Sequence, residues 1–393
     1  MQSGKVKFIA LFLFGILTSP SFGQWVNVPT GTTGKYESAY FFDTQNGIVS
    51  SDSKVLKTSD AGASWTPVSV FGIRDVEFAS TTLGFAAGYA GSSLKKTTDG
   101  GNTWTALTPP TSNALWGVSV VNANTLYVSG TGKVVWKSTN GGSSFSVVNL
   151  PSVPPSDLAV DLDFVSATTG CVLGQYGGVW RTTNGGTSWT NTYPSANIEY
   201  VSIYFLDAMT GFVVGESGTI LKTIDGGVSW SPQVSGSASR LQYVHFLDLN
   251  NGVVAGYDGT VLRTVNGGAT WFKENTGSTE KLRFCYLISP TVAIAGGDNG
   301  TMLRNSNLTT GVGEPDALSN CKIFPNPTNG QFSVRSVDAI KNLKVFDSMG
   351  RLVWESSDST FETTADLSAQ ARGVYFLKVE AAGAVRTFKI VRE

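Results

Sequence analysis

The chain has 393 residues, and its 28 Lys and Arg against 29 Asp and Glu give a formal net charge of −1. The charge balance is +2 in residues 1–23, 16 − 19 = −3 in residues 24–310 and 10 − 10 = 0 in residues 311–393. Nucleic acids and anionic membrane surfaces are bound by a local excess of Lys and Arg, so this distribution disfavours both as partners. Hydrophobic residues make up 41% of the chain, which excludes wholesale disorder, and its 45 glycines favour short strands joined by tight turns.

Residues 1–23 carry a targeting pattern. Lys5 and Lys7 precede an apolar run from Phe8 to Leu17, and small residues flank Phe22. This pattern predicts a signal peptide, too short to be a membrane anchor, that is removed near Gln24. We expect a mature chain without a transmembrane segment.

The middle of the chain is a repeat array. One motif, Ser/Thr-x-Asp/Asn-x-Gly-x-x-Trp, recurs six times, with Ala61 in place of a second glycine in the first copy. Its acid or amide positions are 39, 41, 44, 41 and 41 residues apart: Asp60, Asp99, Asn140, Asn184, Asp225 and Asn266. Each copy ends on an aromatic residue: Trp65, Trp104, Phe145, Trp189, Trp230 and Trp271. A further 41 residues reach Asn307, in a seventh copy that has lost the motif.

Each copy of the motif predicts a tight turn. The Asp or Asn oxygen can accept hydrogen bonds from nearby backbone N–H groups, and glycine supplies the positive φ angle. The segments between copies alternate polar and apolar residues and add three strands, so each repeat holds about four strands. Repeats of about 40–45 residues with four strands are typical of propeller blades. The sequence therefore predicts a seven-bladed β-propeller over residues 24–310, with residues 24–29 completing the last blade.

The motif resembles the Asp-box, or BNR repeat, of sialidases, xyloglucanases and sortilin-type receptors. The fuller pattern, with a basic residue before the box and Asp-Gly-Gly within it, most resembles the propellers of the Ycf48-like group of photosystem II stability and assembly factors. The box is specific for the fold and weakly specific for function, because it occurs in enzymes and non-enzymes.

Residues 311–320 are rich in Gly, Pro and polar residues and predict a linker, followed by a second domain at 321–393. Alternating segments with Asn-Gly and Met-Gly turns predict a small antiparallel β-sandwich there. This region resembles the type A C-terminal sorting domain of the type IX secretion system of Bacteroidetes. The residues that carry the resemblance are Pro325, Asn326, Pro327, Gly350, Gly373 and Tyr375. The resemblance implies secretion machinery as a partner and a final location outside the cell or on its surface, after periplasmic transit.

Binding residues are expected at one mouth of the central channel, where loops lead into the innermost strands. Tyr, Trp and Arg favour recognition of proteins or glycans, and they occur there at Tyr36, Arg74, Trp116, Tyr200, Arg240 and Arg283. The loop that ends at Asp157 is longer than the others. Unselected loop composition remains the alternative interpretation for any one of these residues.

A glycosidase would need two suitably spaced carboxylates. The acids expected near the channel mouth are Glu37, Asp75, Glu77, Asp157, Asp161, Asp163 and Glu199. Asp161 and Asp163 alternate on one strand and share a face, so they are the alternative catalytic candidates. These acids would otherwise line a hydrated channel or accept capping hydrogen bonds. The Phe/Tyr-Arg-Ile-Pro motif of sialidases does not occur in the sequence.

A basic residue precedes every box and its decayed copy: Lys57, Lys96, Lys137, Arg181, Lys222, Arg263 and Arg304. They could form a ring that meets an acidic partner, or each could pair locally on its strand. The single His245 has no identifiable nucleophile partner, and Cys171, Cys285 and Cys321 are too few for a disulfide framework. We predict neither a metal site nor a cofactor.

Together these features predict a secreted or cell-surface propeller that binds a protein or glycan partner without catalysis. The alternative is a glycoside hydrolase of sialidase or xyloglucanase type. Photosystem assembly is not carried over from the resemblance, because the export signals imply a different compartment.

Overall fold

The computed structural model describes residues 24–70, 72–89, 94–131, 134–151, 158–192, 198–308, 321–347, 351–357, 360–381 and 384–393. The chain divides into two compact units, residues 1–310 and 311–393. The predicted signal peptide at 1–23, the linker at 311–320, Asp157 and Gly350 lie outside the described residues.

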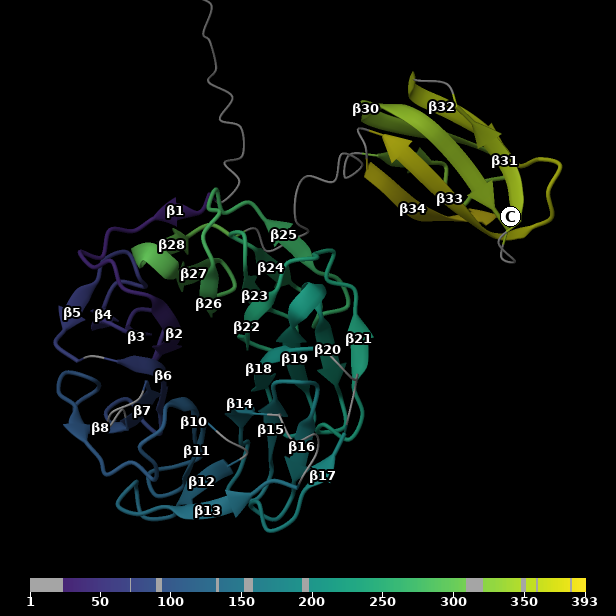
Figure 1. The fold of residues 1–393 in the computed structure, drawn as a ribbon. Helices are drawn as coiled ribbons and strands as arrows, with labels where there is room; N and C mark the ends of the chain where they lie inside the picture. The colour runs from purple at the N-terminus through teal and green to yellow at the C-terminus, as the bar shows by residue number, and fades with distance from the viewer. Residues whose placement is uncertain are drawn as a thin grey trace, which may run out of the picture. The chain divides into compact units, whose positions relative to one another are not determined.

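The first unit consists of seven four-stranded antiparallel sheets, which Figure 1 shows arranged in a ring. The innermost strands are β2 (Tyr36–Phe41), β6 (Ile73–Phe78), β10 (Leu115–Val120), β14 (Ala159–Asp163), β18 (Tyr200–Phe205), β22 (Leu241–Phe246) and β26 (Leu282–Ser289). The second strands are β3 (Gly47–Ser51), β7 (Gly84–Gly88), β11 (Leu126–Gly130), β15 (Gly170–Gly174), β19 (Gly211–Gly215), β23 (Gly252–Gly256) and β27 (Val292–Gly297). The seven-bladed propeller predicted from the repeat spacing is confirmed.

The third strands are β4 (Val55–Thr58), β8 (Lys95–Thr97), β12 (Val134–Ser138), β16 (Val179–Thr182), β20 (Ile220–Thr223), β24 (Val261–Thr264) and β28 (Met302–Asn305). The outer strands are β5 (Thr66–Val68), β9 (Thr105–Ala106), β13 (Ser146–Asn149), β17 (Thr190–Asn191), β21 (Ser231–Gln233), β25 (Phe272–Glu274) and β1 (Val26–Asn27). Two single helical turns, η1 (Glu216–Gly218) and η2 (Asp298–Gly300), follow β19 and β27. No helix among the described residues is long and apolar enough to cross a membrane.

The seventh sheet takes strands from both ends of the propeller sequence, in the order β1-β28-β27-β26. Val26 pairs with Arg304, and the Val28 N–H donates to the Met302 carbonyl at 2.7 Å. Trp25, next to β1, is only 4% exposed and packs in one cluster with Leu282 and Leu303. β1 therefore supplies both the outer edge and part of the core of this sheet.

Apolar contacts between neighbouring sheets form the core of the propeller. The second strands are buried on both faces, because each sheet is covered by the next one. The aromatic residue of each box helps to cover this core: the Trp230 ring meets the Phe205 ring edge-on, with centroids 6.0 Å apart. The Phe205 ring in turn lies over Gly211, where an added Cβ would come within 2.7 Å of it. The glycine that opens β19 is therefore required for packing.

The box turns are held by a small set of repeated hydrogen bonds, which the fifth copy illustrates. The Ser229 N–H donates to Asp225 Oδ1 at 2.9 Å, and the Thr223 hydroxyl donates to the same oxygen at 2.7 Å. The Gly227 N–H donates to the Thr223 hydroxyl at 2.9 Å, with φ angles of 71° and 86° at Gly226 and Gly227. The Asn boxes keep these contacts through the amide oxygen. The acid of the box is thus a turn-forming residue that Asn replaces without loss of a backbone contact.

The basic residue before each box binds the next blade. Lys222 Nζ donates to the Gly267 carbonyl in the following box at 2.7 Å, and Arg304 Nε closes the circle on the Ala61 carbonyl at 2.8 Å. The other contacts to following turns come from Lys57, Lys96, Lys137 and Arg181. Arg263 precedes the sixth box, and the blade that follows it holds the decayed copy; Arg263 pairs with Glu274 instead, at 2.9 Å. Six of the seven basic residues thus connect neighbouring blades, and Arg263 is the one that pairs within its own sheet.

We expect Lys222→Met to lower the free energy of unfolding by about 1–2 kcal/mol, because a charged donor to a buried turn is lost while the aliphatic length is kept. Lys273→Met serves as the control, since Lys273 lies exposed on β25. Urea unfolding followed by tryptophan fluorescence measures both variants. Equal unfolding midpoints for the two variants would contradict the bridging role.

The second unit is a six-stranded antiparallel sheet, built from β29 (Lys322–Phe324), β30 (Gln331–Phe346), β31 (Leu352–Ser356), β32 (Thr360–Asp366), β33 (Gly373–Ala381) and β34 (Ala384–Arg392). The first half of β30 pairs with β29 and β32, and its second half pairs with β31 and β33. The predicted small antiparallel domain is therefore one curled sheet, because a single long strand belongs to both of its halves. Phe332, Val345 and Leu377 lie in its core.

The residues that carry the sorting-domain resemblance hold the ends of this sheet. Asn326 Oδ1 accepts a hydrogen bond from the Val391 N–H at 2.9 Å, between Pro325 and Pro327. The Tyr375 hydroxyl donates to the Ala371 carbonyl at 2.6 Å.

Candidate functional site

The channel wall is formed by the innermost strands, which carry a register shift near their start. On β6 the shift lies between Ile73 and Asp75, and on β18 between Tyr200 and Ser202. The first residue of each strand then points between the sheets, and the second points to the channel mouth. We call these second residues the mouth ring: Glu37, Arg74, Trp116, Val160, Val201, Gln242 and Arg283.

The register shift corrects two of the predicted binding residues. Tyr36 and Tyr200 open their strands, and they are 0% and 1% exposed. Both are core residues, because each occupies the first strand position rather than the second. The Tyr36 hydroxyl is hydrogen-bonded to Thr30 and Thr32 beneath the surface. The other four predicted residues lie in the mouth ring or, for Arg240, directly before β22.

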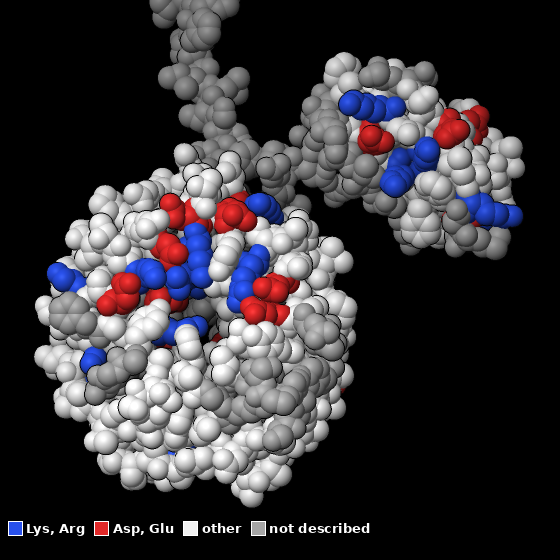
Figure 2. Space-filling model, viewed as in Figure 1, with Lys and Arg blue, Asp and Glu red and all other residues white. Residues whose placement is uncertain are grey.

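Two arginines at the mouth are neutralised by acids. Arg283 Nη1 lies 3.0 Å from Glu37 Oε2 and its Nε contacts Asp298. Arg240 Nη1 lies 2.6 Å from Glu199 and 2.9 Å from Glu216. Figure 2 shows acidic and basic side chains gathered on one face of the propeller, beside the hollow at its centre. These contacts hold neighbouring blades together, and since each arginine meets two acids, its positive charge is already compensated.

Arg74 is in a different situation. Its guanidinium carbon lies 4.3 Å from the centroid of the Trp116 ring. Within the described ranges, its side chain has neither a carboxylate within salt-bridge distance nor a hydrogen-bond acceptor. A guanidinium stacked on an indole is held flat with its N–H edge free, which is a geometry suited to a carboxylate.

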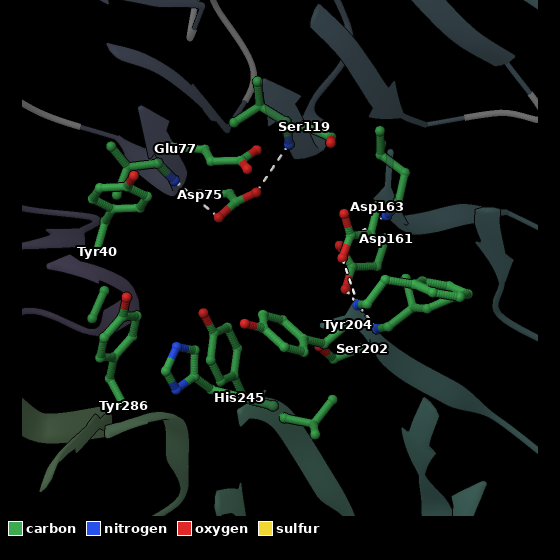
Figure 3. Close-up of a pocket in the computed structure, with 18 residues that line it drawn as sticks. Tyr40, Asp75, Glu77, Ser119, Asp161, Asp163, Ser202, Tyr204, His245 and Tyr286 are labelled. Atoms are coloured by element: carbon green, nitrogen blue, oxygen red, sulfur yellow. Dashed lines mark hydrogen bonds between the residues drawn. The ribbon is translucent and has the colours of Figure 1, made fainter. Parts of the chain in front are cut away.

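Below the mouth, the channel widens into a cavity of about 280 Å³. Its wall is the fifth position of each innermost strand, which we call the lower ring: Tyr40, Glu77, Ser119, Asp163, Tyr204, His245 and Tyr286. Asp75, Asp161 and Tyr243 line it from above. Figure 3 shows Asp161 and Asp163 across this cavity from Tyr40 and Tyr286. Asp161 and Asp163 thus share one face of β14, as their alternation in the sequence predicts.

The lower ring connects each blade to the next. The carboxylates of Glu77 and Asp163 accept from the Val120 N–H at 2.6 Å and the Phe205 N–H at 2.7 Å. Ser119, Tyr204, His245 and Tyr40 make the equivalent contact with the backbone of the following blade. Tyr286 stacks on His245 with centroids 3.7 Å apart. These side chains therefore have a structural role in addition to lining the cavity.

Asp75 and Asp161 hold the blades one layer higher. Asp161 accepts from the Leu162 and Ile203 N–H groups, each at 2.9 Å, so both of its oxygens are used. Asp75 bonds in the same way to Val76 and to Val118. A catalytic acid or base needs a free oxygen within reach of the substrate. Both oxygens of Asp161 are already engaged by the backbone, which weighs against the Asp161 and Asp163 pair as glycosidase residues.

Enclosure by the channel shifts the pKa values of these groups. Burial, together with the charge of Asp75, raises the pKa of Asp161 to about 7. Burial raises the pKa of Asp163 to about 6, although the Phe205 hydrogen bond opposes the shift. Burial and the charge of Asp163 raise the pKa of Glu77 well above its ordinary value. Burial lowers the pKa of His245 to about 3, so this imidazole is neutral at physiological pH.

The tyrosines of the cavity could not be predicted as site residues from the sequence. Tyr40, Tyr204, Tyr243 and Tyr286 occupy channel positions but carry no sequence signal of their own. An alignment of the seven innermost strands by position would have identified them. Among the described residues, no group of three or more His, Cys, Asp or Glu side chains is placed to hold a metal ion.

Comparisons with known proteins match both units. The family described as photosynthesis system II assembly factor YCF48 matches residues 67–197, 150–231 and 192–282, which together span more than half of the chain. The family described as secretion system C-terminal sorting domain matches residues 322–393. No match is found among curated protein sequences.

Solved structures share the propeller fold. YCF48 bound to D1 peptide is 16% identical with a TM-score of 0.60, over 73% of this chain and 98% of that one. YCF48 from Cyanidioschyzon merolae is 17% identical with a TM-score of 0.59, over 72% and 98%. The computationally designed Ika8 protein is 13% identical with a TM-score of 0.51, over 69% and 83%. At these identities the likeness concerns the fold alone.

Proposed function

Since the chain belongs to the family of photosynthesis system II assembly factor YCF48 and ends in a secretion system sorting domain, we propose that it is a secreted, non-catalytic module that binds a protein segment at its channel mouth. The sorting domain directs the propeller to the cell surface or the extracellular space through the type IX machinery. A photosystem subunit is not the partner that this route suggests.

The observation that carries the proposal is the Arg74–Trp116 pair. Its guanidinium edge is free among the described residues, whereas Arg240 and Arg283 are occupied by acids. A stacked Arg and Trp at the centre of a surface supply both a charged anchor and apolar area, the combination found at binding hot spots. We therefore expect the bound segment to present a carboxylate, from Asp, Glu or a chain terminus.

A solved relative supports a peptide as the kind of ligand. The structure entitled YCF48 bound to D1 peptide shows that a propeller of this fold holds a peptide. The mouth ring here combines charged, aromatic and amide side chains in a space lined by seven strands. Such a surface suits an extended chain more than a large folded partner.

Selection from a display library of short random peptides tests the proposal. We expect the selected peptides to carry carboxylates and to lose at least tenfold in affinity for the Arg74→Ala, Trp116→Ala double variant. The control is Arg351→Ala, which removes an Arg with a 71% exposed side chain from the second unit. Peptides that bind the double variant as well as they bind the unaltered protein would contradict the proposal. So would release of reducing ends from a glycan panel.

A further inference from the structure

The cavity below the mouth has the composition of a ligand site that the proposed function does not use. It encloses about 280 Å³ and is lined by four carboxylates, four tyrosines and one histidine. None of its lining residues is Lys or Arg. A bound cation would therefore meet no positive charge in the cavity wall.

Two carboxylates keep one oxygen each for a ligand. Glu77 uses Oε2 for the Val120 N–H, and Asp163 uses Oδ2 for the Phe205 N–H. Their second oxygens have no donor in the described part of the chain. The two acids also raise each other's energy when ionised, since the charge of Asp163 raises the pKa of Glu77. A cation between them would relieve this repulsion.

Aromatic rings form another part of the wall. Tyr40, Tyr204, Tyr243 and Tyr286 line the cavity, and Tyr286 stacks on His245 at 3.7 Å. The faces of such rings are electron-rich and attract organic cations, with about 2 kcal/mol or more for a desolvated pair. Carboxylates together with ring faces favour a cation that has apolar surface, such as an alkylammonium, over a small inorganic ion.

His245 adds a separate indication of a ligand. It is 6% exposed, and its Nδ1 accepts from the Leu287 N–H at 3.3 Å, which assigns the proton of the neutral ring to Nε2. Among the described residues Nε2 has no acceptor, and Figure 3 shows the ring in the cavity wall. This N–H is reached from the cavity, so a ligand oxygen placed there can accept its hydrogen bond.

From this arrangement we propose that the cavity binds a small organic cation of the alkylammonium class that also carries a hydroxyl group. The ammonium lies between the free oxygens of Glu77 and Asp163 and against the tyrosine rings. The hydroxyl accepts from His245 Nε2. This site lies below the Arg74–Trp116 pair and does not require a partner at the mouth.

Calorimetric titration of the purified full chain with choline tests the site. Tetramethylammonium, which lacks the hydroxyl, and dimethylbutanol, the uncharged carbon isostere of choline, are the comparison ligands. We expect choline to bind, tetramethylammonium to bind more weakly, and the isostere not to bind. Equal binding of choline and its isostere, or no choline binding, would overturn the proposal. Saturable binding of calcium chloride in place of choline would also overturn it.

Two variants locate the ligand independently. Glu77→Gln and Asp163→Asn each keep an oxygen for the backbone N–H but remove one negative charge. Each substitution should weaken the affinity for choline at least tenfold. Asp225→Asn is the matched control, because it makes the same change of charge in a box turn where Asn occurs naturally in other copies. Circular dichroism establishes that each variant is folded. Unchanged choline affinity in both channel variants would place the ligand elsewhere and reject the site.

Discussion

Trp25→Ala is expected to lower the free energy of unfolding of the propeller by about 3–5 kcal/mol, the range for removal of a buried Trp side chain. Trp25 is 4% exposed and packs with Leu282, Leu303 and Leu308 in the core of the seventh sheet. Its Nε1 has no hydrogen-bond partner among the described residues, so the substitution removes packing and leaves no polar group unpaired. It also loosens β1, which has only two residues.

Urea unfolding monitored by circular dichroism measures this effect. Trp116→Ala is the control, because it deletes the same side chain from the mouth ring, where Trp116 is partly exposed. We expect a much smaller loss there, about 1 kcal/mol. If the two variants unfold at the same urea concentration, the seventh sheet does not depend on the strand that closes it.

Asp163→Asn is expected to stabilise the protein at pH 8 by about 2–3 kcal/mol. In the folded chain burial disfavours the charge of Asp163 and raises its pKa from the ordinary value of 3.8 to about 6. The folded state then holds this proton to higher pH than the unfolded state does. Its contribution to stability is present below about pH 4 and is lost as the pH rises through about 6. One pKa unit corresponds to about 1.4 kcal/mol, which gives the stated size.

The measurement is the difference in unfolding free energy between Asp163→Asn and the unaltered protein. His245 is present in both proteins, so its own pH-dependent contribution cancels from this difference. We expect the advantage of the variant to grow from pH 4 to pH 8. Asp225→Asn supplies the reverse case, since hydrogen bonds from Ser229 lower the pKa of Asp225 to about 2. The Asp225 carboxylate stabilises the folded state above about pH 4, and Asp225→Asn should lose that stabilisation. If the gain in unfolding free energy of Asp163→Asn did not vary with pH, the raised pKa of Asp163 would be contradicted.

The blade number and the box turns could be predicted because their signals are local. Asp225, Thr223 and Gly227 lie within five residues of one another, and the hydrogen bonds among them need no other part of the chain. The curled sheet of the second unit is less local. It depends on how far β30 continues without a break, and alternation alone does not distinguish one long strand from two shorter ones.

The orientation of side chains at the mouth could not be predicted, because one extra residue in a strand changes which face a side chain occupies. Tyr36 and Arg74 both lie at the start of innermost strands, yet one is in the core and the other in the channel. The hydrogen bond of Asp163 to the next blade likewise depends on tertiary packing. The two residues it joins are 42 positions apart in the sequence and meet only when their adjacent sheets pack together.

The seam in the seventh sheet explains why one copy of the box has decayed. A box turn joins the third strand of a blade to its outer strand, but no direct connection runs from β28 to β1. The seventh copy therefore has no turn to stabilise, and its sequence is released from that constraint. If residue 308 were joined to residue 24 and the chain were reopened between β20 and β21, the fifth copy would be the one with no turn to stabilise. Asp225 and Gly227 would become replaceable, and the new connection would need a box of its own.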